Sequence, residues 1–134
     1  MRLVDAYSRP IATVVLYGLL QEREAHQSIS HRELPLFEEH ERFVRGHPYP
    51  HWYLIENDDT YIGAVYLTHQ DEIGIFIARS HQGRGYGSRA VRLLMQTHPR
   101  DRFLANINPK NSRSIKFFER LGFSPLQHTY ELRP

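Results

Sequence analysis

The 134-residue chain contains no cysteine, so it can form no disulfide and can use no thiol in catalysis. Long apolar runs are also missing. The longest, Ile11–Leu20, is interrupted by threonine, tyrosine and glycine, and it is too short to span a bilayer. No cleavable signal sequence precedes this run. We therefore expect a cytoplasmic protein without a membrane partner.

Neither sign of charge dominates the chain. The 17 Lys and Arg residues oppose 15 Asp and Glu residues, which gives a formal net charge of +2. A nucleic-acid-binding domain usually carries a clustered basic face, so no nucleic-acid partner is predicted. The 9 histidines are scattered and lack the spacing of a metal site, so no metal is predicted either.

The composition is that of an ordinary globular protein, with 40% apolar and 24% charged residues. The chain is long enough to bury a core without disulfides or metals. It contains no internal repeat, low-complexity segment or linker. We therefore expect a single domain over residues 1–134.

The hydrophobic periodicity predicts strands and helices in a defined order. Strands are expected at Arg2–Asp5, Trp52–Glu56, Tyr61–Thr68, Asp71–Arg79, Phe103–Asn108 and Phe123–Leu132. Helices are expected from Pro10 to Glu24, Leu36 to Arg45, Ser88 to about His98, and Ser114 to Leu121. Because three successive strands precede one βαβ unit, the predicted class is α+β, with a mixed, mostly antiparallel sheet and about four helices.

A glycine-rich loop is the most informative motif. Residues Gln82–Gly87 read QGRGYG and separate the apolar stretch Glu72–Ala78 from an amphipathic helix at Ser88–Met95. Glycines let the backbone adopt positive φ and approach a phosphate closely. The N-terminus of the following helix attracts anions. The spacing differs from that of a dinucleotide-binding loop, and no Gly-Lys-Ser/Thr follows as in a P-loop. We predict an anionic ligand with a pyrophosphate.

Two motifs resemble those of the GCN5-related N-acetyltransferases (GNAT). Gln82–Gly87 is similar to the signature Gln/Arg-x-x-Gly-x-Gly/Ala, and Asn111–Phe123 resembles the segment Asn-x-x-Ala/Ser…Tyr-Glu-Lys-x-Gly-Phe. The resemblance covers about Tyr53–Phe123. It implies the GNAT fold, in which two central parallel strands, here Asp71–Arg79 and Phe103–Asn108, splay apart. It also implies transfer of an acetyl group from acetyl-CoA to a primary amine, by direct attack in a ternary complex.

The resemblance further implies which residues hold acetyl-CoA. The pantetheine arm is expected to pair with main-chain groups of Phe76 and Ile77, as an added strand would. The pyrophosphate is expected on the loop amides. Arg84 is either a phosphate contact or a solvated side chain, Asn111 a cofactor contact or a helix cap, and Phe117 a cofactor contact or part of the core. The full predicted set is Phe76, Ile77, Gln82, Gly83, Arg84, Gly85, Tyr86, Gly87, Asn108, Asn111, Ser114 and Phe117.

Glu72 is the first candidate for the general base, because members of this family often place a carboxylate at the start of this strand. His69 is the second candidate, since an ordinary imidazole titrates near neutral pH. A surface role is the alternative for both residues. The predicted catalytic residues are Glu72, His69 and Asn108.

The sequence departs from the family pattern at the general acid. Phe118 stands where the family often has a tyrosine, so no phenol can protonate the leaving thiolate there. Water, or another group such as Ser112, Asn108 or Tyr130, must then stabilise that thiolate.

The acceptor is expected to bind to the loops His26–Leu34 and Gly46–His51, because binding residues gather on loops of a rigid scaffold. The predicted acceptor contacts are His31, Arg32, Tyr53 and Tyr66. The Ser-His-Arg loop and the strand Glu72–Ile77 loosely resemble those of acetyltransferases that act on amino-sugar nucleotides, which makes such a compound the predicted acceptor.

Two other functions stay open from the sequence. One is acetylation of a protein N-terminus or lysine, and the other is a non-catalytic CoA-binding module. Short members of the family often dimerise, so a homodimer is one expected assembly.

Overall fold

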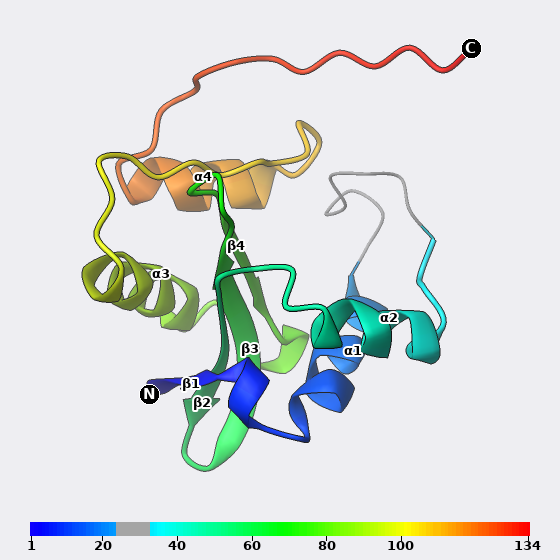
Figure 1. The fold of residues 1–134 in the computed structure, drawn as a ribbon. Coiled ribbons are helices and arrows are strands. Elements are labelled where there is room, and N and C mark those ends of the chain that lie inside the picture. Colours follow the sequence, from blue (N-terminus) through cyan, green and yellow to red (C-terminus); the bar gives the residue numbers. More distant parts are fainter. Residues whose placement is uncertain (24–32) are drawn as a thin grey trace.

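The computed structural model describes residues 1–23 and 33–134. A four-stranded antiparallel sheet in the order β1-β2-β3-β4 lies between two helical layers (Figure 1). The strands are β1 (Arg2–Asp5), β2 (His51–Asn57), β3 (Thr60–Leu67) and β4 (Ile73–Ile77). The helices of the described residues are α1 (Ala12–Glu22), α2 (Phe37–Arg45), α3 (Tyr86–Thr97) and α4 (Ser112–Arg120). The predicted α+β class is confirmed.

The sheet separates two apolar clusters because successive strand residues point to opposite faces. On β2, Leu54 is fully buried in the cluster that faces α1 and α2. The next residue, Ile55, is fully buried in the cluster that faces α3 and α4. The register continues this alternation, since Leu54 pairs with Ala64 and Ala64 pairs with Phe76. Both faces of β3 and β4 are therefore covered, and one edge of β4 remains for a ligand.

The turn between β2 and β3 confirms the predicted hairpin. Asp58 and Asp59 have φ of 48° and 60°. Two successive residues with positive φ are what a tight two-residue hairpin requires, and Asp tolerates this conformation better than most residues.

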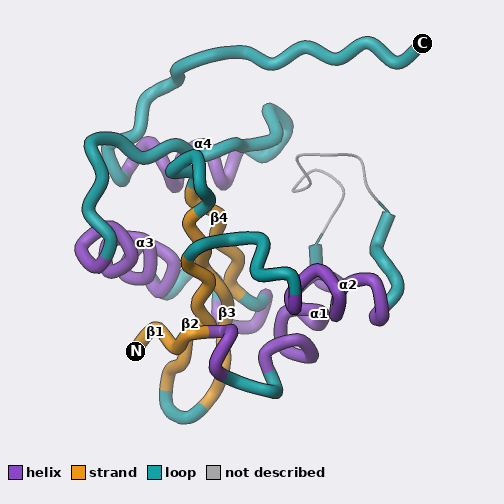
Figure 2. The backbone as a smooth tube through the Cα atoms, viewed as in Figure 1, coloured by secondary structure: helices purple, strands orange, loops and turns teal. Residues whose placement is uncertain are grey.

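The predicted strand Phe103–Asn108 is reduced to a single bridge. Leu104 pairs with Glu72 in parallel, through Leu104 N to Asp71 O at 2.9 Å and Ile73 N to Leu104 O at 2.7 Å. Beyond Leu104, the segment is extended but has no ladder with β4 (Figure 2). The prediction of a full strand was wrong, because divergence from β4 removes the partner that a ladder needs.

The predicted last strand, Phe123–Leu132, was also wrong. This segment contains no strand and runs away from the body of the molecule toward the C-terminus (Figure 1). Tyr130 is 90% exposed and Leu132 is 89% exposed. An alternating pattern shows that a segment can pair, but a strand needs a neighbouring edge, and none adjoins this one.

No helix of the described residues is long and apolar enough to cross a membrane. Within the same residues, no group of three or more His, Asp or Glu side chains is arranged to hold a metal ion.

Three histidines make the folded state sensitive to acid. Burial lowers the pKa of His40, which is 3% exposed, and also lowers the pKa of His51 and His98, whose rings stack at 3.5 Å. Each folded-state pKa lies below the unfolded value of about 6.5, so the unfolded chain binds more protons as pH falls. The contribution of these neutral histidines to the free energy of unfolding is complete above about pH 6.5 and is lost as the pH falls below it.

We therefore expect the melting temperature to fall between about pH 7.5 and about pH 5. The variant His40→Leu removes the buried group that must stay neutral, so its melting temperature should depend less on pH. A melting temperature that rises on acidification, or the same slope in the variant, would contradict this account.

Candidate active site

A cleft of about 490 Å³ opens where β4 and residues 105–108 diverge. Its floor is the open edge of β4. Its walls come from residues 106–108, the N-terminus of α3 and one face of α4. The single parallel bridge at Leu104 closes one end, and the glycine-rich loop forms the other.

The open edge of β4 presents main-chain groups to the cleft at alternate residues. Glu72 O accepts from Thr68 N and Ala78 N donates to Ile62 O, so even-numbered residues of this strand point their main-chain groups toward β3. Ile73 N instead donates to Leu104 O on the opposite side. Because this direction alternates along a strand, the main-chain groups of Ile75 and Ile77 face the cleft.

This geometry corrects the main-chain role expected for Phe76. Its carbonyl lies against Gly63 of β3, so it is turned away from the cleft. The side chain of Phe76 still lines the cleft. Ile77 O accepts from Gln82 Nε2 at 2.8 Å. The groups left for a ligand on this edge are Ile73 O, both groups of Ile75 and Ile77 N–H.

The glycine-rich loop presents free amides to the same cleft. Gly83 and Gly85 have φ of 78° and 83°, which glycine adopts without strain. Gly85 is the N-cap of α3, and Arg89 N makes the first intrahelical bond, to Gly85 O at 3.2 Å. The amides of residues 86–88 therefore have no acceptor within the helix. Together with the positive end of α3, they form an anion site.

Gln82 ties this loop to both walls. Besides its bond to Ile77 O, its Oε1 accepts from Arg113 Nη1 at 2.8 Å. Ile77 ends β4 and Arg113 lies in the first turn of α4, so one side chain sets the spacing between strand and helix.

The wall formed by α4 combines polar and aromatic groups. Asn111 caps the helix by accepting from Ser114 N at 3.1 Å, which confirms the capping role, and it also lines the cleft. Phe117 packs close to Gly87, where an added Cβ would lie 3.2 Å from its ring. Phe118 is 4% exposed and stacks edge-on against Phe117 at 5.0 Å. It has no proton to give, and it holds Phe117 against the loop.

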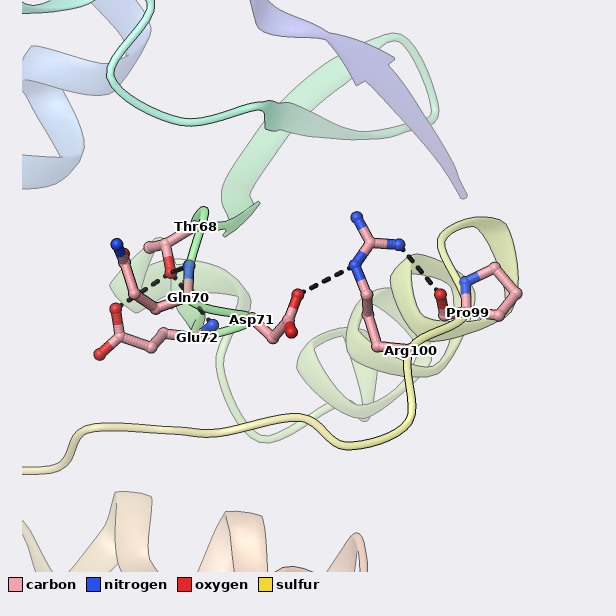
Figure 3. Close-up of polar contacts among 6 residues, drawn as sticks. All are labelled: Thr68, Gln70, Asp71, Glu72, Pro99 and Arg100. Carbon is pink, nitrogen blue, oxygen red and sulfur yellow. Dashed lines mark hydrogen bonds and ion pairs between the residues drawn. The ribbon is translucent and has the colours of Figure 1, made fainter.

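Glu72 lies at the closed end of the cleft. Figure 3 shows its carboxylate hydrogen-bonded to Thr68 at the turn between β3 and β4. Thr68 Oγ1 donates to Glu72 Oε1 at 3.0 Å, and Asn106 Nδ2 donates to Glu72 Oε2. Thr68 Oγ1 also accepts from Gln70 N at 3.2 Å and from Glu72 N at 3.1 Å. A carboxylate has about four lone-pair sites, so it can accept a further proton donor from the cleft.

An ion pair anchors the turn that carries Glu72. Arg100 Nε lies 2.9 Å from Asp71 Oδ1, and Arg100 Nη1 donates to Pro99 O at 2.9 Å (Figure 3). Asp71 has φ of 62°, and its main-chain oxygen accepts from Leu104 N. This turn therefore joins β3, β4 and the segment after α3 at the closed end.

An aromatic layer covers β4 on the α1–α2 side. The ring of Tyr66 crosses Gly74, where an added Cβ would lie 2.0 Å from Tyr66 Cζ. Tyr49 stacks on Tyr66 with ring centroids 4.0 Å apart and an interplanar angle of 7°. Burial raises the pKa of the Tyr49 hydroxyl, so this phenol is uncharged at neutral pH. Glycine at position 74 therefore creates the space for an aromatic surface beside Glu72.

Gly74→Ala is expected to destabilise the protein by about 1–3 kcal/mol, because the methyl group would overlap the Tyr66 ring and separate it from Tyr49. Chemical denaturation measures the loss. The matched control is Gly18→Ala in α1, where an added Cβ meets nothing within 4 Å and the better helix propensity of alanine should raise stability. Equal stability of the Gly74 variant and the wild type would rule out the tight contact.

The structure brings most of the predicted cofactor residues to the cleft. Those that line it are Phe76, Ile77, Gln82, Gly83, Gly85, Tyr86, Gly87, Asn108, Asn111, Ser114 and Phe117. Arg84 does not: its side chain is exposed on the loop and is absent from the lining.

Three other predictions have different outcomes. Tyr66 lines the cleft as expected. Tyr53 does not line the cleft: its hydroxyl bonds His98 Nε2 at 2.6 Å in the layer that faces α3. His69 is exposed on the turn and does not line the cleft, which leaves Glu72 as the candidate base that the cleft contains. His31 and Arg32 lie outside the described residues.

Sequence reasoning missed several residues of the cleft. Thr68 and Asn106 orient Glu72, and Arg23 and Arg113 add charge to the walls. The hairpin pattern could have indicated Thr68, because it follows β3 and faces Glu72 across a tight turn. Arg23 carries no local signal, since it reaches the cleft only through the packing of α1 against the sheet.

The comparisons with known proteins agree with this geometry. The model of the acetyltransferase (GNAT) family matches residues 16–123, which is most of the chain and includes β2, β3, β4, the loop and α4. The chain belongs to the GNAT family. It is therefore an acetyl-CoA-dependent N-acetyltransferase, and the family and cofactor predicted from the two motifs are confirmed. No curated protein sequence matches it.

Solved structures share the GNAT fold with this chain at low identity. A chimera of the Vibrio cholerae spermidine N-acetyltransferase SpeG and hSSAT is 18% identical, with a TM-score of 0.71 over 95% of this chain and 82% of that one. An aminoglycoside 6'-N-acetyltransferase from Acinetobacter haemolyticus is 13% identical, with a TM-score of 0.73 over 100% and 98%. A putative acetyltransferase from Salmonella typhimurium, solved with acetyl-CoA, is 15% identical, with a TM-score of 0.66 over 92% and 78%. At these identities the likeness shows the fold alone.

Proposed function

We propose that this GNAT protein acetylates the primary amine of a small molecule in the cytoplasm, and that the acceptor is an amino-sugar nucleotide. The observation that carries the proposal is the cleft itself. An open strand edge leads from the free amides of the loop to a carboxylate held by two hydrogen bonds.

The residues present fit acetyl-CoA. The amides of residues 86–88 suit its pyrophosphate, and Ile75 and Ile77 offer an unpaired strand edge to the pantetheine arm. Ser114 and Phe117 face that edge from α4. When bound, acetyl-CoA supplies a thioester: the acceptor nitrogen forms a bond to the carbonyl carbon, the carbon–sulfur bond breaks, and the nitrogen loses a proton.

Glu72 receives this proton, directly or through one water. Thr68 and Asn106 each donate to one oxygen of the carboxylate, so it stays oriented while its remaining lone pairs face the cleft. A positioned general base of this kind contributes a large part of the rate.

Asn108 is the candidate that stabilises the departing thiolate. It lines the cleft, and an amide N–H is a donor to a negatively charged sulfur. Of the other two candidates, Tyr130 is 90% exposed on the C-terminal segment, and Ser112 is exposed and does not line the cleft.

Release of free thiol from acetyl-CoA tests the function. The acceptor panel contains amino-sugar nucleotides, free amino sugars, a polyamine, a peptide with a free N-terminus and a lysine peptide. We expect the highest kcat/KM for an amino-sugar nucleotide. Turnover of the peptides alone would favour the protein acetyltransferase. Binding of acetyl-CoA without thiol release from any amine would favour a non-catalytic CoA-binding module. Sedimentation of the same preparation tests the expected homodimer.

A further inference from the structure

We propose that the acceptor carries an anionic group, a phosphate or a carboxylate, several bonds away from its amine, and that Arg23 binds this group. The inference rests on the proposed function and adds the residue that recognises the anionic part of the acceptor. Four observations support it: the position of Arg23, the contact that fixes this position, the face of β4 beneath it and the charges of the cleft.

Arg23 directly follows α1 and reaches the cleft from the α1–α2 side. Its Cζ lies 5.9 Å from the centroid of the Phe76 ring. Arg23 is the C-cap of α1, and no residue of the helix itself (Ala12–Glu22) lines the cleft. None of the ion pairs found in residues 1–23 and 33–134 involves Arg23. Its planar guanidinium is thus placed over an aromatic ring, with its donors available to a carboxylate or a phosphate.

A tertiary contact fixes the end of α1 above the strand. Glu22 Oε1 accepts from Arg79 N at 2.7 Å, and Glu22 O accepts from Arg79 Nη2 at 3.4 Å. Arg79 lies just beyond β4, fifty-seven residues from Glu22 in the sequence. These two hydrogen bonds between Glu22 and Arg79 therefore hold the neighbouring Arg23 at the cleft.

One face of β4 connects Arg23 with the candidate base. Glu72, Gly74 and Phe76 are alternate residues along the chain and lie on the same face of the sheet. The Tyr66 ring covers Gly74, between Glu72 and Phe76. At about 3.3 Å per residue, the positions of Glu72 and Phe76 are about 13 Å apart along the strand. An amine near Glu72 and an anion near Arg23 are then farther apart than the two ends of an α-amino acid. The phosphate of a sugar nucleotide suits this separation, and the aromatic surface between them suits a sugar ring.

The charges of the described cleft disfavour a polycationic acceptor. Within the described residues, Glu72 is the one acidic side chain of this lining and already accepts from two donors. The lining also includes four arginines: Arg23, Arg92, Arg113 and Arg120, the last at the end of α4. Arg92 and Arg113 come from α3 and α4, beside the predicted cofactor wall. Arg23 alone among these comes from the opposite layer, which packs on the face of β4 that carries Phe76.

The experiment compares matched amines on the full chain saturated with CoA. The probes are glucosamine and glucosamine 6-phosphate, in which the ring separates the amine from the phosphate, then 8-aminooctanol and 8-aminooctanoate, in which seven methylenes separate the amine from the anion. Calorimetry measures binding, and thiol release from acetyl-CoA measures turnover separately. We expect an anionic member of a pair to bind more tightly than its neutral partner. Arg23→Gln should weaken that binding, and raise the KM of that acceptor, about tenfold or more, with kcat and the affinity for CoA nearly unchanged. Arg23→Lys should restore part of the loss.

The matched control is Arg45→Gln, because Arg45 is 75% exposed and pairs with Glu41 on α2, away from the cleft. The pair of probes in which the Arg23→Gln substitution weakens binding shows whether the site recognises a phosphate or a carboxylate. Equal binding of both members in both pairs, or unchanged binding of the anionic probes in Arg23→Gln, overturns the inference. So does a loss that falls on CoA affinity. Arg23-dependent binding without thiol release would instead sink the proposed function and leave the anion site standing.

Discussion

Gly85→Val is expected to weaken the affinity for CoA by roughly two orders of magnitude, while the chain still folds. Gly85 has φ of 83° at the N-cap of α3, and a β-branched side chain resists this conformation. An added Cβ meets nothing within 4 Å, so the substitution acts through the backbone rather than through a clash. The loop must relax to another conformation, which turns the amides of residues 86–88 away from the pyrophosphate.

Calorimetric titration with CoA measures this effect, and thermal denaturation shows whether the fold survives. Gly18→Val is the control: it adds the same side chain in α1, where φ is not positive and the space is open. The control should bind CoA as the wild type does. Wild-type affinity in a folded Gly85 variant would mean that the loop amides do not hold the cofactor.

The cofactor half of the site could be predicted from the sequence because its function depends on the backbone. Gly83 and Gly85 encode positive φ directly, and Asn111 three residues before Ser114 encodes a helix cap. Such signals are local, so one sequence suffices to find them. The same holds for the β2–β3 hairpin, where Asp58 and Asp59 mark the turn.

The acceptor half could not be predicted, because tertiary contacts build it. Arg23 reaches Phe76 only because Glu22 binds the backbone of Arg79, and no spacing in the sequence encodes that contact. Tyr53 and Tyr66 both belong to the sheet and have similar sequence surroundings. The pairing register of the strands decides toward which face of the sheet each side chain points. It places Tyr53 and Tyr66 on opposite faces, and of these two only Tyr66 lines the cleft.

The two strand predictions that failed share one cause. Phe103–Asn108 and Phe123–Leu132 both have strand-forming residues, yet a ladder depends on an edge supplied by another part of the chain. Divergence after Leu104 removes that edge in the first case and opens the cleft. The lost pairing is therefore a requirement of the site, since a complete ladder between β4 and residues 104–108 would fill the space for the pantetheine arm.

Glu72→Gln is expected to lower kcat by about 100-fold to 10,000-fold, with little change in the affinity for CoA, because it removes the proton acceptor from the closed end of the cleft. Glutamine keeps an oxygen that can accept from Thr68 or Asn106, so the local structure should persist. Thiol release at saturating acceptor measures kcat, and calorimetric titration measures the affinity for CoA.

The control is Glu56→Gln, because Glu56 pairs with Arg2 at 2.7 Å on the far strand pair of the sheet and does not line the cleft. Its rate should match that of the wild type. If Glu72→Gln kept the wild-type kcat, the base would have to be another group. Thr68→Val separates positioning from proton transfer: it removes the hydroxyl that orients Glu72 but leaves the carboxylate, so kcat should fall less than in Glu72→Gln.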